Sequence, residues 1–334
     1  MRLDAHTSSL MLASSVLASL AVVGCADTGA SQNGASEDFR VRNAQFLAEP
    51  LPGTVPPDAG SKPAAADAGD AALPTIIQVL TSNYIVTQGQ GGKKFNGFAS
   101  TNTYAIAVAL DDETRGHWVQ PVGGPDPVMG GLTWDLVTDF GDNITAGHHD
   151  LHVVAIDKQG RAGEQATLTV CVAGRIPDNL HACDDSRAPP RAVIALTWDT
   201  EVDLDLQVIA PNGVLTDAKH PLTGQRDPSA PPPDDGKLDR DSNASCVIDG
   251  IRAESLVWKT TMPHGRYGMY VNLFDSCKQP AGRFKLAVYT AVPNRDSKSG
   301  QVLKLWFEKS GELTSVAENG GAARGLFVSE FEFH

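Results

Sequence analysis

Two aspartates in one short segment of this chain have a spacing that suits metal binding. Asp203 and Asp205 alternate with apolar residues over 202–208, a pattern typical of a β-strand with one buried face. Side chains two residues apart in a strand share a face, about 6.6 Å from each other. Carboxylates this close repel and hold their protons more tightly unless a cation lies between them. Because Ca²⁺ prefers oxygen ligands, we expect a calcium site on this face.

A second acidic run follows about 35 residues later and repeats oxygen-bearing side chains at every other position. The candidate ligands in this run are Asp239, Asp241 and Asn243. They match the first three ligand positions of an EF-hand loop, but the segment is not an EF-hand. Ala244 stands where that loop requires glycine, and Gly250 stands where it requires a bidentate glutamate. Asp249 or Glu254 would then complete the ligand set; the alternative is a solvated acidic loop without an ion.

The sequence carries no recognisable catalytic signature. Neither a Gly-x-Ser-x-Gly nor a His-Glu-x-x-His motif occurs. His148, Asp150 and His152 would share one strand face, as zinc ligands do, but the alternation of a half-buried strand explains them equally well. We therefore expect no enzymatic activity. The alternative is a carbohydrate-active or peptidase-accessory component in which Asp203 or Asp205 acts as a general acid.

Four cysteines beyond the N-terminal region suggest two disulfides, as is usual in an exported chain. Three pairings are possible. The turn at 261–265 folds its flanking segments into a hairpin that brings Cys246 towards Cys277, and Cys171 and Cys183 close a short loop. We therefore expect the pairs Cys171–Cys183 and Cys246–Cys277. Buried free thiols are the alternative.

The first two dozen residues have the features of an export signal. An apolar stretch over 10–23 is shorter than the ~20 residues that span a bilayer, and it ends in Val22-Val23-Gly24-Cys25. This ending resembles the lipobox of bacterial lipoproteins. The resemblance implies a signal peptide over 1–24 and acylation of Cys25, with palmitate among the acyl chains. The residue after Cys25 is Ala26 and not an aspartate, which resembles the sorting signal of outer-membrane lipoproteins. A structural, unmodified Cys25 is the alternative.

Composition limits the partners of this chain. Its 334 residues carry a net charge of −13, which argues against nucleic acid and against direct binding to anionic lipid. Any membrane attachment should therefore come from the lipid anchor. Residues 25–73 are rich in Ala, Pro and Gly, so they predict a disordered tether, with the apolar groups 39–41 and 46–47 as exceptions.

The rest of the chain predicts an all-β protein with two β-sandwich domains after the tether. Short alternating segments separated by Gly, Asn and Asp turns fill residues 74–174 and again 191–334, with a Pro-containing linker over 175–190. The segment 146–160, with Asp157 and Gly160 at its turn, resembles the last hairpin of bacterial immunoglobulin-like domains. That resemblance implies an immunoglobulin-like sandwich for residues 74–174.

Residues 192–289 carry a second resemblance. It rests on Trp198-Asp199-Thr200, Asp203-Leu204-Asp205-Leu206-Gln207-Val208, Pro211-Asn212-Gly213, Leu238-Asp239-Arg240-Asp241 and Pro263-His264-Gly265-Arg266-Tyr267. These segments resemble the YfaP-type family of secreted bacterial proteins, which has no settled activity. More distantly, they are similar to the C-terminal β-sandwich of secreted peptidase precursors, where Asp side chains bind calcium. The similarity implies Asp203, Asp205, Asp239 and Asp241 as calcium ligands.

Together these features predict a lipid-anchored protein of the cell envelope, on its periplasmic or surface face. We expect a binding or adhesion module stabilised by calcium, with a glycan or a protein as its ligand. Aromatic side chains that would stack on sugars, if they are not buried in the core, are Trp258, Tyr267, Tyr270 and Trp306. A purely structural envelope protein is the further alternative.

Overall fold

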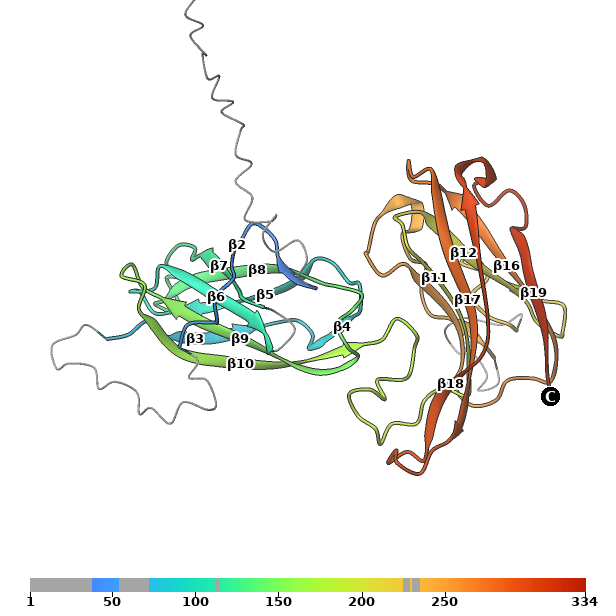
Figure 1. Cartoon of the computed structure of the whole chain (residues 1–334), viewed down its shortest axis with the longest axis horizontal. Coiled ribbons are helices and arrows are strands. Elements are labelled where there is room, and N and C mark those ends of the chain that lie inside the picture. Colours follow the sequence, from blue (N-terminus) through green and yellow to red (C-terminus); the bar gives the residue numbers. More distant parts are fainter. Residues whose placement is uncertain (1–37, 54–71, 112–114, 225–228, 230–234) are drawn as a thin grey trace, which may run out of the picture.

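The computed structural model describes residues 38–53, 72–111, 115–224, 229 and 235–334 (Figure 1). The expected all-β fold is confirmed: two domains each pair two β-sheets around an apolar core. Among the described residues, the helical elements are short 3₁₀ turns such as Ala244–Cys246, and none is long and apolar enough to cross a membrane. The predicted signal peptide and the predicted lipidation site Cys25 lie outside the described residues.

The first domain packs a four-stranded sheet against a six-stranded one. The strand order of the smaller sheet is β1 (Phe39–Val41), β8 (Leu132–Phe140), β5 (Lys93–Ala99) and β3 (Ile76–Leu80). The order of the larger sheet is β2 (Gln45–Leu47), β7 (His117–Pro121), β6 (Ala105–Leu110), β9 (Gly147–Ile156), β10 (Ala162–Ala173) and β4 (Ile85–Thr87). The Asp157 carboxylate accepts backbone hydrogen bonds from Gln159 and Arg161, and Gly160 has a φ of 78°. These two residues therefore shape the β9–β10 turn, as expected.

The N-terminal strands β1 and β2 correct the predicted tether. Residues 38–53 belong to the first domain, where β1 pairs with β8 and β2 pairs with β7. The Phe39 side chain is fully buried, and its ring lies 5.3 Å from that of Phe140. Two short apolar groups were enough for this, because each only extends an existing sheet by one strand. The tether prediction is therefore wrong for residues 38–53, and residues 54–71 lie outside the described part of the chain.

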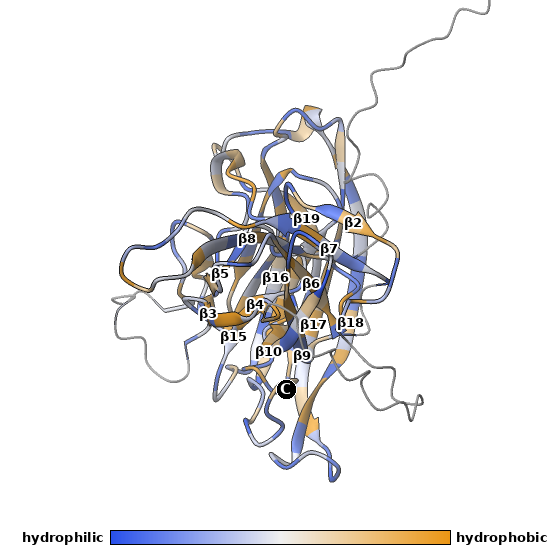
Figure 2. Ribbon diagram, turned by 90° about the vertical axis from the view of Figure 1, so that its left-hand side faces the viewer, coloured by the Kyte–Doolittle hydropathy of each residue, from blue (hydrophilic) through white to orange (hydrophobic). Residues whose placement is uncertain are grey.

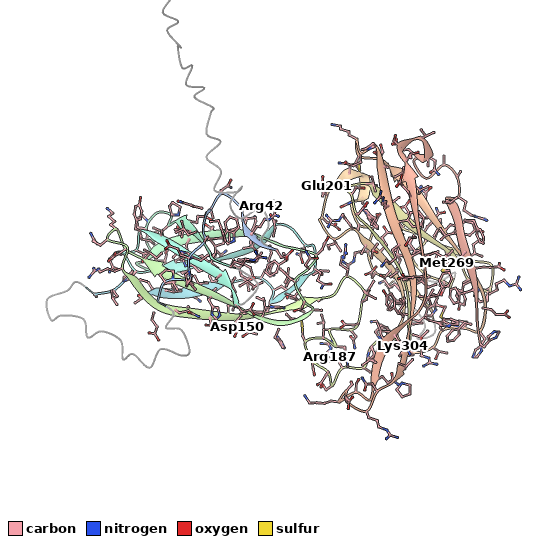
Figure 3. All side chains as sticks on the ribbon, in the orientation of Figure 1. Arg42, Asp150, Arg187, Glu201, Met269 and Lys304 are labelled. Atoms are coloured by element: carbon pink, nitrogen blue, oxygen red, sulfur yellow. A yellow bond between two sulfur atoms is a disulfide. The ribbon has the colours of Figure 1, made fainter. Side chains whose placement is uncertain are left out.

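The described residues of the second domain form nine strands in two sheets. One sheet has the order β14 (Lys237–Leu238), β15 (Ala253–Trp258), β11 (Ala192–Trp198), β17 (Ala281–Pro293) and β18 (Gln301–Thr314). The other has the order β13 (Leu215–Thr216), β12 (Asp203–Ile209), β16 (Gly265–Asp275) and β19 (Leu326–Phe333). Figure 2 shows polar and apolar positions alternating along the strands, and Met269 lies among the side chains between the sheets (Figure 3). The alternation fixes which face of each strand meets the core.

The link between the domains is anchored at both ends. The expected disulfide between Cys171 and Cys183 joins the linker to β10. Further along the linker, Oδ1 of Asp185 lies 2.9 Å from Nζ of Lys298, and this ion pair joins the linker to the β17–β18 loop. A direct contact between the domains adds to this, because Arg252 donates a hydrogen bond to the Asp142 carboxylate.

Truncation of Phe39 tests the structural role of the N-terminal strands. Phe39→Ala should lower the stability of the first domain by about 3–5 kcal/mol, because it leaves a cavity in a closed core. Chemical denaturation of the full chain, followed by tryptophan fluorescence, measures this loss. Gln45→Ala, at an exposed position of β2, is the matched control. If both variants unfold like the parent, β1 does not contribute to the core.

Candidate metal centre

Three aspartates meet at one end of the second domain. Asp203 and Asp205 come from β12, and Asp241 comes from the loop that follows β14. Each offers a carboxylate oxygen, and these oxygens lie within 4.8 Å of one another. They line a cavity of about 260 Å³. The structure thus brings together the aspartate pair of the strand and one member of the second acidic run.

The two strand aspartates are held in place by different donors. The backbone N–H of Ser245 donates to Oδ2 of Asp203 at 2.7 Å, and Asn272 Nδ2 donates to Oδ2 of Asp205 at 3.0 Å. Asn272 is the cross-strand neighbour of Asp205 on β16. The second oxygen of Asp203 is buried and accepts no hydrogen bond. Since buried polar atoms are rarely left without a partner, this oxygen is a position where a cation would compensate the loss of water.

Burial perturbs the proton affinity of this cluster. Burial raises the pKa of Asp203 to about 7, and repulsion from Asp205 and Asp241 adds to the increase. Burial likewise raises the pKa of Asp205 to about 6, with a further contribution from Asp241. Burial and the neighbouring Asp249 raise the pKa of Asp241. Asp203 and Asp205 are only 2% and 8% exposed, so water does little to separate their charges. A divalent ion at their centre would keep all three ionised.

Glu254, on β15, lies behind the cluster and acts as a clamp. Its side chain is fully buried. Its Oε2 accepts a hydrogen bond from the Leu206 N–H at 2.7 Å, and its Oε1 accepts one from the Ser242 N–H at 3.3 Å. Strand β13 pairs only with Val208 and Ile209, so Glu254 supplies the acceptor that β12 lacks further along. Burial, together with the charges of the cluster, raises the pKa of Glu254 well above its ordinary value.

Asp249, the other candidate to complete the ligand set, also holds the loop. Its Oδ1 accepts hydrogen bonds from the Ser242 hydroxyl at 2.9 Å and from the Ile251 N–H at 2.8 Å. Asp249 and Glu254 therefore fix the segment that presents Asp241. Both act as positioning groups in this structure.

Asp239 and Asn243 do not join the three aspartates. Asp239 accepts hydrogen bonds from the Ser255 N–H at 2.7 Å and from its neighbour Arg240. The Asn243 amide donates to the Val202 carbonyl at 2.9 Å. Their predicted role as ligands depended on an extended segment, in which alternate residues share a face. The loop turns at Asn243, whose φ is 62°, so this residue leaves the shared face. Asp239 precedes the turn and is held instead by its hydrogen bonds with Ser255 and Arg240.

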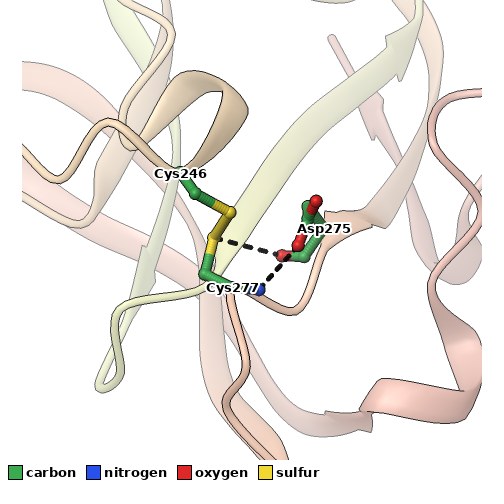
Figure 4. Close-up of side chains that lie close together, drawn as sticks. All are labelled: Cys246, Asp275 and Cys277. Carbon is green, nitrogen blue, oxygen red and sulfur yellow. Dashed lines mark hydrogen bonds between the residues drawn. A yellow bond between two sulfur atoms is a disulfide. The ribbon is translucent and has the colours of Figure 1, made fainter.

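The expected disulfide between Cys246 and Cys277 is present and joins this loop to the end of β16 (Figure 4). Asp275 Oδ1 accepts the Cys277 N–H at 2.7 Å, which fixes the chain beside the bond. The 3₁₀ turn that contains Ser245 and Cys246 is thereby tied to β16. It places the Ser245 N–H against Asp203.

Several cavity residues were not singled out from the sequence. The wall includes Gln207, Asp217, Ala218, Lys219, Phe274 and Gly321. Phe274 lies two residues after Asn272 and therefore shares its strand face, so it becomes a candidate once Asn272 is known to contact Asp205. No sequence pattern indicates Asp217 or Lys219, because both lie on a loop. Asp217 fixes that loop by accepting backbone hydrogen bonds from Lys219 at 3.0 Å and His220 at 2.7 Å.

The other sequence candidates have structural explanations. Asp150 accepts a hydrogen bond from Thr169 at 2.6 Å on the neighbouring strand, and His152 lies 3.2 Å from the Thr167 hydroxyl. Trp258 and Tyr267 are fully buried, so they offer no face to a sugar. Trp306 is half exposed, with its ring against Phe331 and Phe333; Tyr270 lies against Phe327 on the outer face of its sheet.

Comparison with known proteins adds little beyond the fold. No protein-family model and no curated protein matches this chain. Among solved structures, it is similar to the fibronectin(III)-like modules of Clostridium thermocellum CbhA, with 11% identity over 75% of this chain and 97% of that one, and a TM-score of 0.19. It is also similar to Bacteroides ovatus SGBP-B of a mixed-linkage glucan utilization locus, in complex with a mixed-linkage heptasaccharide, with 13% identity over 69% of this chain and a TM-score of 0.18. The match spans 43% of that protein.

A third similar structure is BcpA, the major pilin subunit of Bacillus cereus. Identity is 9% over 73% of this chain and 67% of that one, with a TM-score of 0.19. At this level of similarity, none of these proteins assigns a function to the chain.

The raised pKa values of the strand aspartates predict how stability depends on pH without metal. The folded protein keeps protons on Asp203 and Asp205 up to about pH 6–7, whereas the unfolded chain releases them near the ordinary pKa of 3.8. The stability contributed by these groups is therefore complete below about pH 4 and is lost as the pH rises through about 6–7. Thermal melts of metal-free protein across this window should show the decrease.

Asp203→Asn should flatten this pH dependence, and Asp135→Asn, at an exposed position of β8, should leave it unchanged. If Asp203→Asn leaves the pH dependence of stability of the metal-free protein unchanged, Asp203 is not the group responsible for it.

The clamp formed by Glu254 can be tested with an isosteric change. Glu254 accepts hydrogen bonds from the N–H groups of Leu206 and Ser242. In Glu254→Gln, the side-chain amide has one oxygen, so one of these two N–H groups loses its acceptor. We expect a loss of about 1–3 kcal/mol in the free energy of unfolding. Urea denaturation measures this loss, with the half-exposed Glu308→Gln on β18 as the control. Equal stability of the two variants would show that Glu254 does not hold β12 to the acidic loop.

Proposed function

We propose that the protein is a non-catalytic binding or adhesion module of the cell envelope whose second domain is stabilised by Ca²⁺. The observation that carries the metal assignment is the buried, unpartnered Oδ1 of Asp203, in a cluster whose three carboxylates offer oxygens within 4.8 Å of one another. Asp203, Asp205 and Asp241 would hold the ion. Its chemistry would be to neutralise the cluster and fasten β12 to the acidic loop.

The donor set favours calcium over other divalent ions. All three side chains offer carboxylate oxygens, which suit hard cations, and no histidine or thiolate joins this cluster among the described residues. One of the three, Asp241, is exposed and lies on a loop. Ca²⁺ accepts six to eight oxygens in variable geometry, whereas Mg²⁺ demands a near-ideal octahedron, so this mixed set from a strand and a loop suits Ca²⁺ better.

The envelope location rests on the N-terminal pattern. The lipobox-like ending at Cys25 supports acylation and an outer-membrane anchor, with the folded domains carried on the segment that follows. The ligand of such a module would be a glycan or a protein. A structural envelope protein is the simpler alternative, and binding to a glycan array distinguishes it from the module.

A second candidate function has one observation in its favour. The pKa of Asp203, raised to about 7, would suit a general acid in an enzyme component. An ion at the cluster would hold Asp203 ionised and abolish that role. Turnover of hydrolase substrates in chelator, lost in Asp203→Asn, would support the enzyme and overturn the proposal.

Calcium should stabilise the second domain. With a dissociation constant of about 10⁻⁴–10⁻³ M, typical of extracellular modules, ~10 mM Ca²⁺ would add about 1–3 kcal/mol to the free energy of unfolding. Thermal melts of the full chain with calcium and with a chelator measure the increase. Asp205→Asn should abolish it, and Asp135→Asn should preserve it. Identical melting curves in calcium and in chelator would overturn the metal assignment.

A further inference from the structure

We propose that the metal centre also captures a neutral sugar, whose vicinal hydroxyls bind the ion inside the cavity of the second domain. This inference rests on the proposed calcium site and extends it from a stabilising ion to a ligand-binding one. It follows from the number of protein ligands, the shape and lining of the cavity, and the charge around it.

Among the described residues, three side chains converge on the proposed ion. Ca²⁺ takes six to eight oxygens, whereas three carboxylates converge here. Oδ2 of Asp203 and Oδ2 of Asp205 already accept hydrogen bonds from Ser245 and Asn272. Both oxygens of Glu254 accept backbone hydrogen bonds, and Oδ1 of Asp249 accepts hydrogen bonds from the Ser242 hydroxyl and the Ile251 N–H. Coordination positions that these three side chains leave open would be filled from the cavity that they line, by water or by a ligand.

The cavity that these positions face has the size and lining for one sugar ring. Its volume of about 260 Å³ lies below the ~300–1,000 Å³ of sites for drug-sized ligands. Phe274 and Lys219 line the cavity together with the three aspartates, so an aromatic ring and a hydrogen-bond donor are available there. Gly321 has a φ of 72°, and a Cβ there would lie 3.1 Å from the Phe274 ring and 3.4 Å from Lys219 Nζ. A side chain at position 321 would therefore crowd both the Phe274 ring and the Lys219 amine.

The charge of the cavity selects a neutral ligand. Its lining contains four aspartates, Asp203, Asp205, Asp217 and Asp241, and one lysine, Lys219. With a divalent ion bound, the formal charge is about −1, so a carboxylate or phosphate would meet net repulsion. Adjacent hydroxyls of a sugar offer two uncharged oxygens to the ion, while the apolar C–H face of the ring packs on Phe274. The amine of Lys219 would then donate to a ring or hydroxyl oxygen.

The test uses the full chain and four simple probes, the methyl glycosides of mannose, glucose, galactose and fucose. Ligand-observed NMR in calcium should show binding of at least one glycoside, and addition of a chelator should abolish it. Phe274→Ala and Lys219→Met should each weaken that binding at least fivefold, while calcium still raises the melting temperature of both variants. Lys219 is exposed, so its variant keeps the test valid if Phe274→Ala fails to fold.

The outcomes separate this inference from the proposal on which it rests. A calcium-dependent rise in melting temperature without binding of any of the four glycosides overturns the inference and leaves the metal site standing. No effect of calcium on melting overturns both. Preferential binding of glucuronate or of a phosphorylated peptide would contradict the charge argument, and sugar binding that persists in chelator would place the sugar away from the ion.

Discussion

The burial of like charges is the constraint on which the second domain depends. Asp203 and Asp205 are almost fully removed from water on one strand, and Asp241 approaches them from a loop. Such an arrangement persists only if something relieves the mutual repulsion and the lost hydration of the carboxylates. Protonation does so at low pH, and a divalent ion would do so near neutral pH. The surrounding loops are organised so that this cluster persists.

That organisation recruits elements from both sheets. Glu254, on β15, binds backbone N–H groups of β12 and of the acidic loop. The disulfide between Cys246 and Cys277 ties the same loop to β16. Asp249 holds the loop internally through Ser242. An ion at the cluster would therefore couple three strands, and its removal would loosen a region larger than the three carboxylates themselves.

Much of this architecture is predictable from the sequence where the signal is local. Strand alternation identifies the two sandwiches and places Asp203 and Asp205 on one face. The hairpin at 261–265 leads to the pairing of Cys246 with Cys277. The prediction fails where tertiary contacts decide. Asp239 and Asn243 follow a ligand-like spacing, but their side chains bind Ser255, Arg240 and Val202 instead, and a pattern of residue types does not reveal those contacts.

The remaining differences have the same origin. Residues 38–53 have the composition of a spacer, but the Phe39 side chain packs in the core of the first domain against strands distant in the sequence. Glu254 has the composition of a ligand, but β13 does not reach Leu206 on its side of β12, and Glu254 binds the Leu206 N–H there. Neither the depth of a core nor an unpaired strand edge is visible before the strands are assembled.

All functional inferences here depend on the carboxylates of the second domain sharing a single bound cation. A crystal structure of the protein grown with calcium, with the ion located by its anomalous scattering, measures this directly. We predict one peak about 2.3–2.6 Å from oxygens of Asp203, Asp205 and Asp241, with its outer positions open to the cavity. A site filled only by water, or a calcium ion bound at Asp239 instead, would contradict the account.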